Sequence, residues 1–317
     1  MFEGRTAPCS ERLDNMAVPD DLLKGPNALA GYGHSERGPR LWIDGLDADP
    51  WLRRSFAVYG ETFTLEAGAD RHCTGRHDLT TGRSATCPAR ARLSAPDNEQ
   101  CAACFAATGF NPAFYNAPVV SEQQSRRNLD PHVVYLASFG PGVRKVGMTH
   151  APRRLGRLLE QGARLGVLIA ECPNAESARE LEAFVATEIG LPESVRGARK
   201  RQLLERPVSM LDARRELAAL LKRVAARRPE VNPNAEILEL DRHYGAADLF
   251  ETRLADLSET LPAAISGRCL GLVGDVLIMS ENGSRYMLPL TPLIAQRIEL
   301  HAAERPNRFI GQLGFSF

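Results

Sequence analysis

Four of the seven cysteines lie within one segment, at a spacing that suits a metal ion. They form the pattern C-x13-C-x13-C-x2-C, made by Cys73, Cys87, Cys101 and Cys104. Two cysteines separated by two residues are typical of zinc knuckles, because both thiolates then reach one ion at about 2.3 Å. Four sulfur ligands fill a tetrahedral site and leave no position for a reactive water, so we expect a structural Zn²⁺.

The chain around these cysteines needs such a clamp. Residues 71–116 are rich in Cys, Gly, Pro and Ala and show little hydrophobic periodicity, so they cannot easily bury a core of their own. Metal binding would supply the missing folding free energy. His72 and His77 are alternatives for one ligand. The remaining cysteines have no partner at ligand spacing and are expected to be core residues; they are Cys9, Cys172 and Cys269.

A second group of polar residues follows, on elements that the hydrophobic pattern predicts. Residues 132–150 predict a β-hairpin. Its two strands are HVVYLASFG and VRKVGMTH, and Gly-Pro-Gly forms the turn between them. Leucines at helical spacing after Pro152 predict a helix that ends near Gly162. Residues 164–173 then predict a third strand, and residues 174–190 a helix with Asn174 as its N-cap and Gly190 as its stop.

The hairpin carries two tripeptides that resemble the motifs of GIY-YIG nucleases. Val133-Val134-Tyr135 is followed ten residues later by Lys145-Val146-Gly147. The resemblance covers residues 71–204 and is to an uncharacterised branch that joins a cysteine cluster to this module. It implies a small antiparallel sheet flanked by helices, which acts on a nucleic-acid phosphodiester.

The resemblance also implies a role for individual residues. Tyr135 would orient or deprotonate the attacking water. Arg154 would bind the scissile phosphate through its planar guanidinium, and Glu182 would hold a single Mg²⁺. Neighbouring residues of the same type are alternatives, namely Arg153 and Arg157 for the phosphate, and Glu176 and Glu180 for the metal ion.

Two positions depart from the motif. Lys145 stands where YIG has its tyrosine, and Val133 stands where GIY has glycine. An ammonium binds a phosphate, but it cannot replace a phenol unless its pKa is strongly lowered. Thr149 and His150, directly after the second strand, are further candidates to line the same cleft, with His150 as a proton shuttle.

The basic residues concentrate in the middle of the chain. Residues 144–228 carry 18 Lys and Arg against 10 Asp and Glu, whereas residues 229–317 carry 7 against 12. A basic cluster that follows the Glu182 helix is expected to contact nucleic-acid phosphates; it consists of Arg196, Arg199, Lys200 and Arg201. Aromatic residues are few and scattered, so no stacking platform for single strands is predicted.

These patterns predict an α+β protein with four regions. They are an N-terminal arm and small β-element (1–70), a four-cysteine zinc-type segment (71–116), a GIY-YIG-like module with basic helices (130–228) and a β-rich C-terminal domain (229–317). No window of about 18 apolar residues and no signal peptide are present, so a cytoplasmic protein without a membrane partner is expected.

The leading hypothesis is a Mg²⁺-dependent phosphodiester-cleaving enzyme that acts on nucleic acid. It requires Tyr135, Arg154 and Glu182 to meet in one cleft. The first alternative, favoured by Lys145, is a non-catalytic nucleic-acid-binding or regulatory protein. The second is an enzyme on a small molecule, since a fold does not fix a function.

Overall fold

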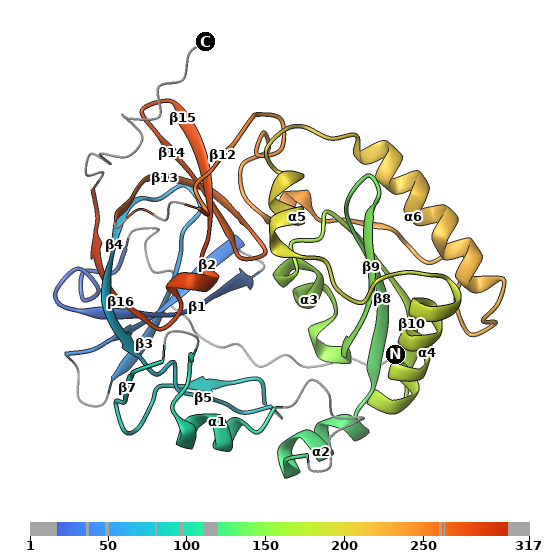
Figure 1. The fold of residues 1–317 in the computed structure, drawn as a ribbon, viewed down its shortest axis with the longest axis horizontal. Helices are drawn as coiled ribbons and strands as arrows, with labels where there is room; N and C mark the ends of the chain where they lie inside the picture. The colour runs from blue at the N-terminus through green and yellow to red at the C-terminus, as the bar shows by residue number, and fades with distance from the viewer. Residues whose placement is uncertain are drawn as a thin grey trace, which may run out of the picture.

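The computed structural model describes residues 18–35, 38–47, 51–79, 81–95, 98–110, 120–259, 262 and 264–303. These residues form a mixed α/β structure with one large, mostly antiparallel sheet, a smaller antiparallel sheet and few helices (Figure 1). Residues 1–17 of the expected N-terminal arm, with Cys9, lie outside the described residues, as do residues 111–116 of the cysteine segment.

The large sheet has ten strands, drawn from both ends of the chain. Nine of them lie in the order β12-β15-β14-β13-β4-β16-β1-β2-β3, and β7 pairs with β4. The N-terminal strands are β1 (Asn27–Ser35), β2 (Gly38–Gly45), β3 (Leu52–Ala57), β4 (Thr62–His72) and β7 (Arg92–Leu93). The C-terminal strands are β12 (Ala255–Asp256), β13 (Ala264–Val273), β14 (Val276–Glu281), β15 (Ser284–Pro289) and β16 (Gln296–His301).

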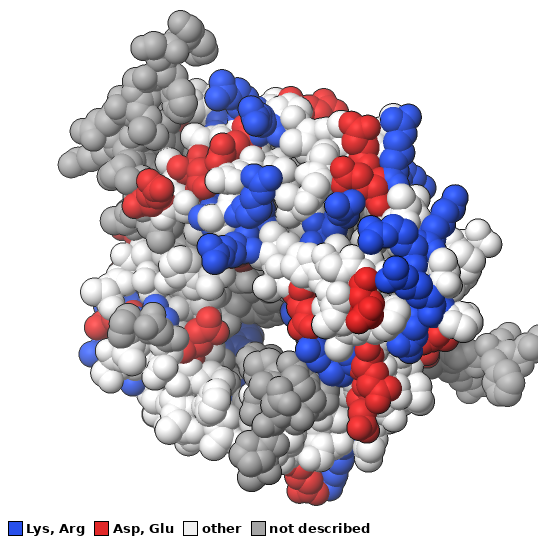
Figure 2. Space-filling view, turned by 45° about the vertical axis from the view of Figure 1, so that its right-hand side comes forward, with Lys and Arg blue, Asp and Glu red and all other residues white. Residues whose placement is uncertain are grey.

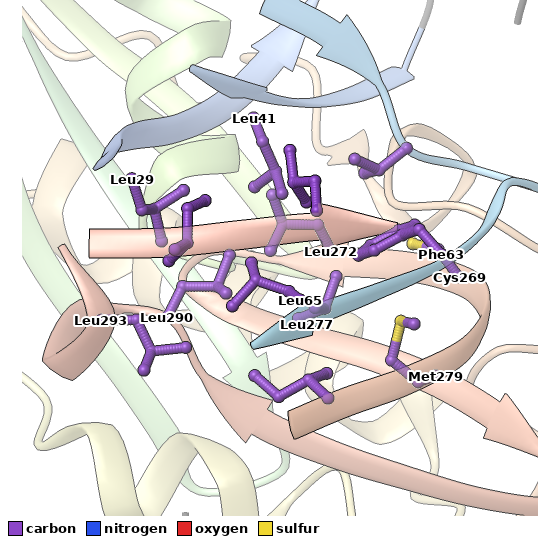
Figure 3. Close-up of a cluster of buried hydrophobic side chains, with 14 of the residues drawn as sticks. Leu29, Leu41, Phe63, Leu65, Cys269, Leu272, Leu277, Met279, Leu290 and Leu293 are labelled. Atoms are coloured by element: carbon purple, nitrogen blue, oxygen red, sulfur yellow. The ribbon is translucent and has the colours of Figure 1, made fainter. Parts of the chain in front are cut away.

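This pairing differs from the two separate β regions expected at the two ends of the chain. Strand β16 lies between β4 and β1, so the first and last described strands are hydrogen-bonded neighbours. The sheet curls around one core, in which side chains from both ends of the chain meet (Figure 3), among them Leu29, Leu41, Phe63, Leu272 and Leu277. Alternation of apolar and polar residues identifies a strand but not its partner, which is why the sequence did not join them.

The smaller sheet has the order β11-β10-β8-β9 and contains the expected hairpin. Its strands are β8 (His132–Gly140), β9 (Val143–His150), β10 (Leu165–Cys172) and β11 (Leu238–Glu239). Gly140 and Gly142 both have positive φ, which is why the tight turn of the hairpin uses glycine. The predicted hairpin and third strand are therefore confirmed.

Helices cover both faces of the smaller sheet (Figure 1). The helices α4 (Ala175–Glu188) and α6 (Met210–Ala225) bury one face, and α3 (Arg154–Glu160) packs on the other. As predicted, the Asn174 side chain caps α4 by accepting from the Ser177 backbone N–H. The face under α3 shares a core with Val273 and Met287 of the large sheet, so apolar contact joins the two sheets.

The remaining elements are short. The cysteine segment contains β5 (Arg76–His77), β6 (Ser84–Ala85) and α1 (Ala102–Thr108), and α2 (Glu122–Leu129) leads into β8. Helix α5 (Gly197–Gln202) precedes α6, and single turns occur at η1 (Ala151–Arg153), η2 (Asp241–His243) and η3 (Thr291–Leu293). None of the described helices is long and apolar enough to cross a bilayer.

Candidate functional site

The four cysteines converge from three separate parts of their segment. Their Sγ atoms all lie within 4.8 Å of one another, and the Sγ atoms of Cys87 and Cys101 are 4.0 Å apart. Zinc ligands at about 2.3 Å in a tetrahedron have their sulfur atoms about 3.8 Å apart. The cluster is therefore compatible with zinc. Trp51 packs beside Cys73, Cys87 and Cys104, which are all buried.

Backbone N–H groups point at this cluster, as expected for thiolate ligands. Cys73 Sγ accepts from the N–H of Gly75 at 3.4 Å and from that of Cys101 at 3.2 Å. Gly75 has φ +82, and a Cβ at this position would lie 1.9 Å from the carbonyl oxygen of Ala85. Only glycine fits this turn, which turns the N–H toward the sulfur. The cysteine spacing thus predicted a cluster that backbone N–H groups also stabilise by donating to Cys73 Sγ.

The alternative ligands lie elsewhere. His77 Nδ1 is 2.6 Å from Ser84 Oγ, and the His72 ring packs edge-on against Trp51. Neither histidine belongs to the group of four sulfur atoms. Cys172 and Cys269 are buried residues of the cores on either side of the molecule, as expected from their spacing.

Tyr135 and Lys145 lie on the same face of the hairpin. The register pairs Tyr135 with Gly147 and Ala137 with Lys145, so the two side chains are diagonal neighbours. Lys145 Nζ is 5.8 Å from the centroid of the Tyr135 ring. Both side chains are buried, with residue exposures of 1% for Tyr135 and 6% for Lys145.

Gly147 makes room for the phenol. A Cβ at this position would lie 2.4 Å from the hydroxyl oxygen of Tyr135, closer than side-chain atoms approach. The glycine of the second tripeptide is therefore required by packing against the tyrosine of the first. Burial raises the pKa of Tyr135, so its hydroxyl keeps its proton at neutral pH.

Arg154 does not join this group. Its guanidinium forms an ion pair with Glu171 and is half exposed, so its expected position in a shared cleft is wrong. One helical turn further on, Arg157 lies beside Tyr135, close enough to hydrogen-bond to the phenol, and its charge lowers the pKa of that phenol. Arg154 is the first residue of α3, where its guanidinium donates to the Ala151 carbonyl and pairs with Glu171, whereas Arg157 lies further along the helix beside the phenol. Arg153 pairs with Glu160.

Glu182, on α4, acts on Tyr135 and Lys145 through its charge. It is 7% exposed, and its charge raises the pKa values of Tyr135 and Lys145. Burial raises the pKa of Glu182 itself, and Arg179 opposes that shift by donating to its carboxylate at 2.7 Å. The same Arg179 nitrogen lies 2.8 Å from Glu193 Oε2. The fallback carboxylates Glu176 and Glu180 contribute to none of these shifts.

Lys145 and Lys200 form a pair of amines with unusual titration. Burial, reinforced by the charge of Arg157, lowers the pKa of Lys145 to about 8. Burial also lowers the pKa of Lys200 to about 8. Both contact Gln161, whose side-chain oxygen is 3.5 Å from Lys145 Nζ and whose backbone oxygen is 2.7 Å from Lys200 Nζ. A substantial fraction of Lys145 is therefore neutral near pH 8.

The remaining candidates spread over a wider area. Thr149 is buried opposite Val133, and His150 Nε2 is 3.2 Å from Asp130. In the basic cluster, Lys200 packs over the Phe139 ring and Arg201 pairs with Asp256, so these two hold α5 in place.

Arg196 and Arg199 are the exposed members of the basic cluster. Figure 2 shows Lys and Arg gathered toward one side of the visible face, with Asp and Glu among them. The basic cluster that the sequence predicts is therefore divided, with two exposed members and two members that pack against the protein.

Sequence reasoning missed Gln161, Arg179 and Glu193 as members of the group around Tyr135. They lie 26, 44 and 58 residues after it and belong to no tripeptide motif. Only the register of the hairpin and the packing of α3 and α4 bring them together.

A family model described as "Protein of unknown function (DUF2797)" matches residues 61–287. The match includes the four clustered cysteines, the whole smaller sheet with its helices, and much of the large sheet. No curated protein and no solved structure matches the chain.

The cysteine cluster predicts metal-dependent stability. Cys104→Ser should reduce bound zinc from one ion per chain toward none, as measured by atomic emission, and lower the free energy of unfolding by more than about 2 kcal/mol. Cys172→Ala is the matched control and should keep its zinc. Full zinc retention in Cys104→Ser, with unchanged stability, would contradict the site.

The buried Lys145 predicts a variant that is more stable than the wild type. Lys145→Met removes an ammonium that is desolvated beside Arg157 and should raise the free energy of unfolding at pH 7 by about 1–3 kcal/mol. The folded-state pKa lies below that of the unfolded chain, so the wild type gains stability as pH rises from about 8 to about 10.5. The advantage of the variant should shrink across that window.

Urea denaturation at pH 7 and pH 10 measures this difference. Lys222→Met, at an exposed position of α6, is the control and should change stability little at either pH. A Lys145→Met protein that is no more stable than the wild type at pH 7 would show that the ammonium is not desolvated.

Proposed function

This chain belongs to the DUF2797 family of proteins of unknown function, and we propose that it is a metal-dependent phosphodiesterase that acts on nucleic acid through a GIY-YIG-like site. One observation carries the proposal. Lys145 lies beside the Tyr135 ring, and the charges of Arg157 on α3 and Glu182 on α4 act on both, so side chains of four types lie near one another. A phenol, an amine, a guanidinium and a carboxylate together supply what phosphodiester hydrolysis needs.

Arg157 is the proposed ligand of the scissile phosphate. Its side chain is 34% exposed, whereas the phenol beside it is almost fully buried, so the guanidinium is more accessible to a phosphate than the phenol is. A planar guanidinium can contact two phosphate oxygens and offset the negative charge that develops on them. Its ion-pair partner Glu160 is 3.5 Å away, so the guanidinium can still turn toward a phosphate.

Lys145 is the proposed base. As a neutral amine it takes a proton from the attacking water, while the protonated Tyr135 hydroxyl holds that water by a hydrogen bond. The oxygen of water then bonds to phosphorus, the bond from phosphorus to the leaving oxygen breaks, and that oxygen takes a proton from solvent. In this assignment Lys145, which replaces the tyrosine of the YIG motif, acts as the base.

Glu182 is the residue that would hold Mg²⁺. Magnesium keeps several waters and takes one or two protein carboxylates together with phosphate oxygens, so a single buried glutamate fits this need. When bound, the ion would polarise the phosphoryl group. Without the ion, Arg179 pairs with both Glu182 and Glu193. It must release Glu182 Oε2 if that oxygen is to bind the ion.

Zinc has a separate role in this proposal. The four thiolates fill the coordination sphere, so the ion would act as a clamp for residues 71–110 rather than as a catalyst. The clamp would also fix β5 and α1 against the rest of the molecule, because these elements have few apolar contacts of their own.

One observation favours a second function, a nucleic-acid-binding protein without catalysis. The Arg179–Glu182 ion pair occupies the carboxylate that a metal ion would need. In this alternative Arg157 and the exposed arginines of the α5 region bind phosphates, and the affinity falls steeply with salt.

Cleavage assays distinguish the two functions. The full chain with Mg²⁺ should cut at least one member of a panel of single-stranded, duplex and branched DNA and RNA, and the rate should rise with pH up to about 8 as Lys145 loses its proton. Arg157→Gln and Glu182→Gln should each slow cleavage by about 100-fold or more. The matched control Arg154→Gln, whose partner Glu171 lies outside the group, should change the rate less than about threefold.

Two results would count against the enzyme. Equal losses of cleavage rate in Arg154→Gln and Arg157→Gln would contradict the assignment of Arg157 as the phosphate ligand. Salt-dependent binding with no cleavage of any substrate would support the binding protein instead.

A further inference from the structure

A cavity lies outside the Tyr135 group. It has a volume of about 970 Å³ and lies between the large sheet, the cysteine segment and the start of α3. Four aromatic residues from distant parts of the sequence line it, namely Tyr32, Trp42, Phe105 and Phe110. The fold thus brings aromatic residues that are scattered in the sequence to one cavity.

We propose that this pocket binds unpaired nucleotides of a single-stranded nucleic acid and leads their backbone toward Arg157. The inference rests on the proposed function and names the substrate class. In the bound state the bases would stack on Trp42 and Phe105, and the phosphates would contact Arg127 and Arg153.

Trp42 is held as a rigid surface for stacking. Its indole lies across β1, where a Cβ at Gly33 would be 2.4 Å from the ring and a Cβ at Gly31 would be 3.4 Å away. Two glycines therefore let one side of the ring rest on the strand, and the half-buried indole still lines the cavity. Phe105 and Phe110 are 63% and 48% exposed, which is high for large apolar side chains.

Arginines gather at the end of the cavity nearest the Tyr135 group. Arg127 and Arg153 line the cavity, and Arg157 lies one turn beyond Arg153. Burial, followed by the charge of Arg153, lowers the pKa of Arg127, and Arg157 contributes to the same shift. The charge of Asp130 opposes this shift. Guanidinium groups gathered at one end of a cavity attract anions.

Glu160 connects the cavity to the Tyr135 group. It lines the cavity, pairs with Arg153 and lies 3.5 Å from Arg157. A backbone whose phosphates replace Glu160 as the partner of these arginines would pass directly from the aromatic residues to Arg157. The cavity and the proposed reaction site are therefore adjacent parts of one path.

The pocket suits an unpaired strand better than a duplex. Aromatic rings reach the face of a base only when that base is unpaired and unstacked. A volume of about 970 Å³ is that of a small-ligand site and holds a few nucleotides at most. Asp78 and Glu99 also line it, and carboxylates there can accept hydrogen bonds from the amino groups of bases.

Fluorescence anisotropy without added Mg²⁺ tests the pocket separately from cleavage. A labelled 12-nucleotide DNA or RNA strand should bind the full chain more tightly than a duplex of the same sequence. Phe105→Ala and Arg127→Gln should each weaken binding of the single strand about tenfold. Exposed Tyr59→Ala and Arg126→Gln, whose side chain pairs with Glu122 outside the cavity, are the matched controls and should change affinity less than about twofold.

Tryptophan emission gives a second readout. The single strand should quench the emission of the wild type, and this quenching should be lost in Trp42→Phe, a variant that keeps an aromatic ring against β1. Tighter binding of the duplex, or unchanged affinity in Phe105→Ala and Arg127→Gln, would overturn the pocket and leave the cleavage proposal standing. Binding that depends on Phe105 and Arg127, without cleavage of any substrate, would support the pocket and contradict the cleavage proposal.

Discussion

The close contact between Tyr135 and Gly147 is the constraint on which the rest of the candidate site depends. A Cβ at position 147 would lie 2.4 Å from the phenol oxygen, so the tyrosine can occupy this face of the hairpin only because its partner is glycine. The register that creates the contact also places Lys145 on the same face, beside the ring. Helix α3 then closes over this face and brings Arg157 to the phenol.

A cost in stability accompanies this arrangement. Lys145, Lys200 and Glu182 are ionisable groups held largely out of water, and burial shifts the pKa of each toward its neutral form. An apolar face would pack better against α3, so the polar group is best explained by a function that needs it. The large sheet offsets this cost, because it supplies an extended apolar core and also packs against the far side of the α3 layer.

Sequence predicted the local elements of the smaller sheet well and their long-range neighbours poorly. The Gly-Pro-Gly turn, the Asn174 cap and the cysteine spacing each depend on residues close together in the chain, and each has the expected structure. The pairing of β16 with β1 depends on residues about 270 positions apart, which no local pattern encodes. The tripeptides located Tyr135, but only the contacts in the structure distinguished Arg157 from Arg154, and only the fold brought Trp42 and Phe105 to one cavity.

The titration of Lys145 is the most direct test of the account, because a buried amine beside the proposed phosphate site should respond to a polyanion. The chain has only four lysines, so ¹⁵N-lysine NMR resolves this amine, and Lys145→Met assigns its signal. We expect a pKa of about 8 in the free protein and an increase when a single-stranded oligonucleotide binds without Mg²⁺. An ordinary pKa near 10.5, or a value that does not move on binding, would contradict the proposed phosphodiester site.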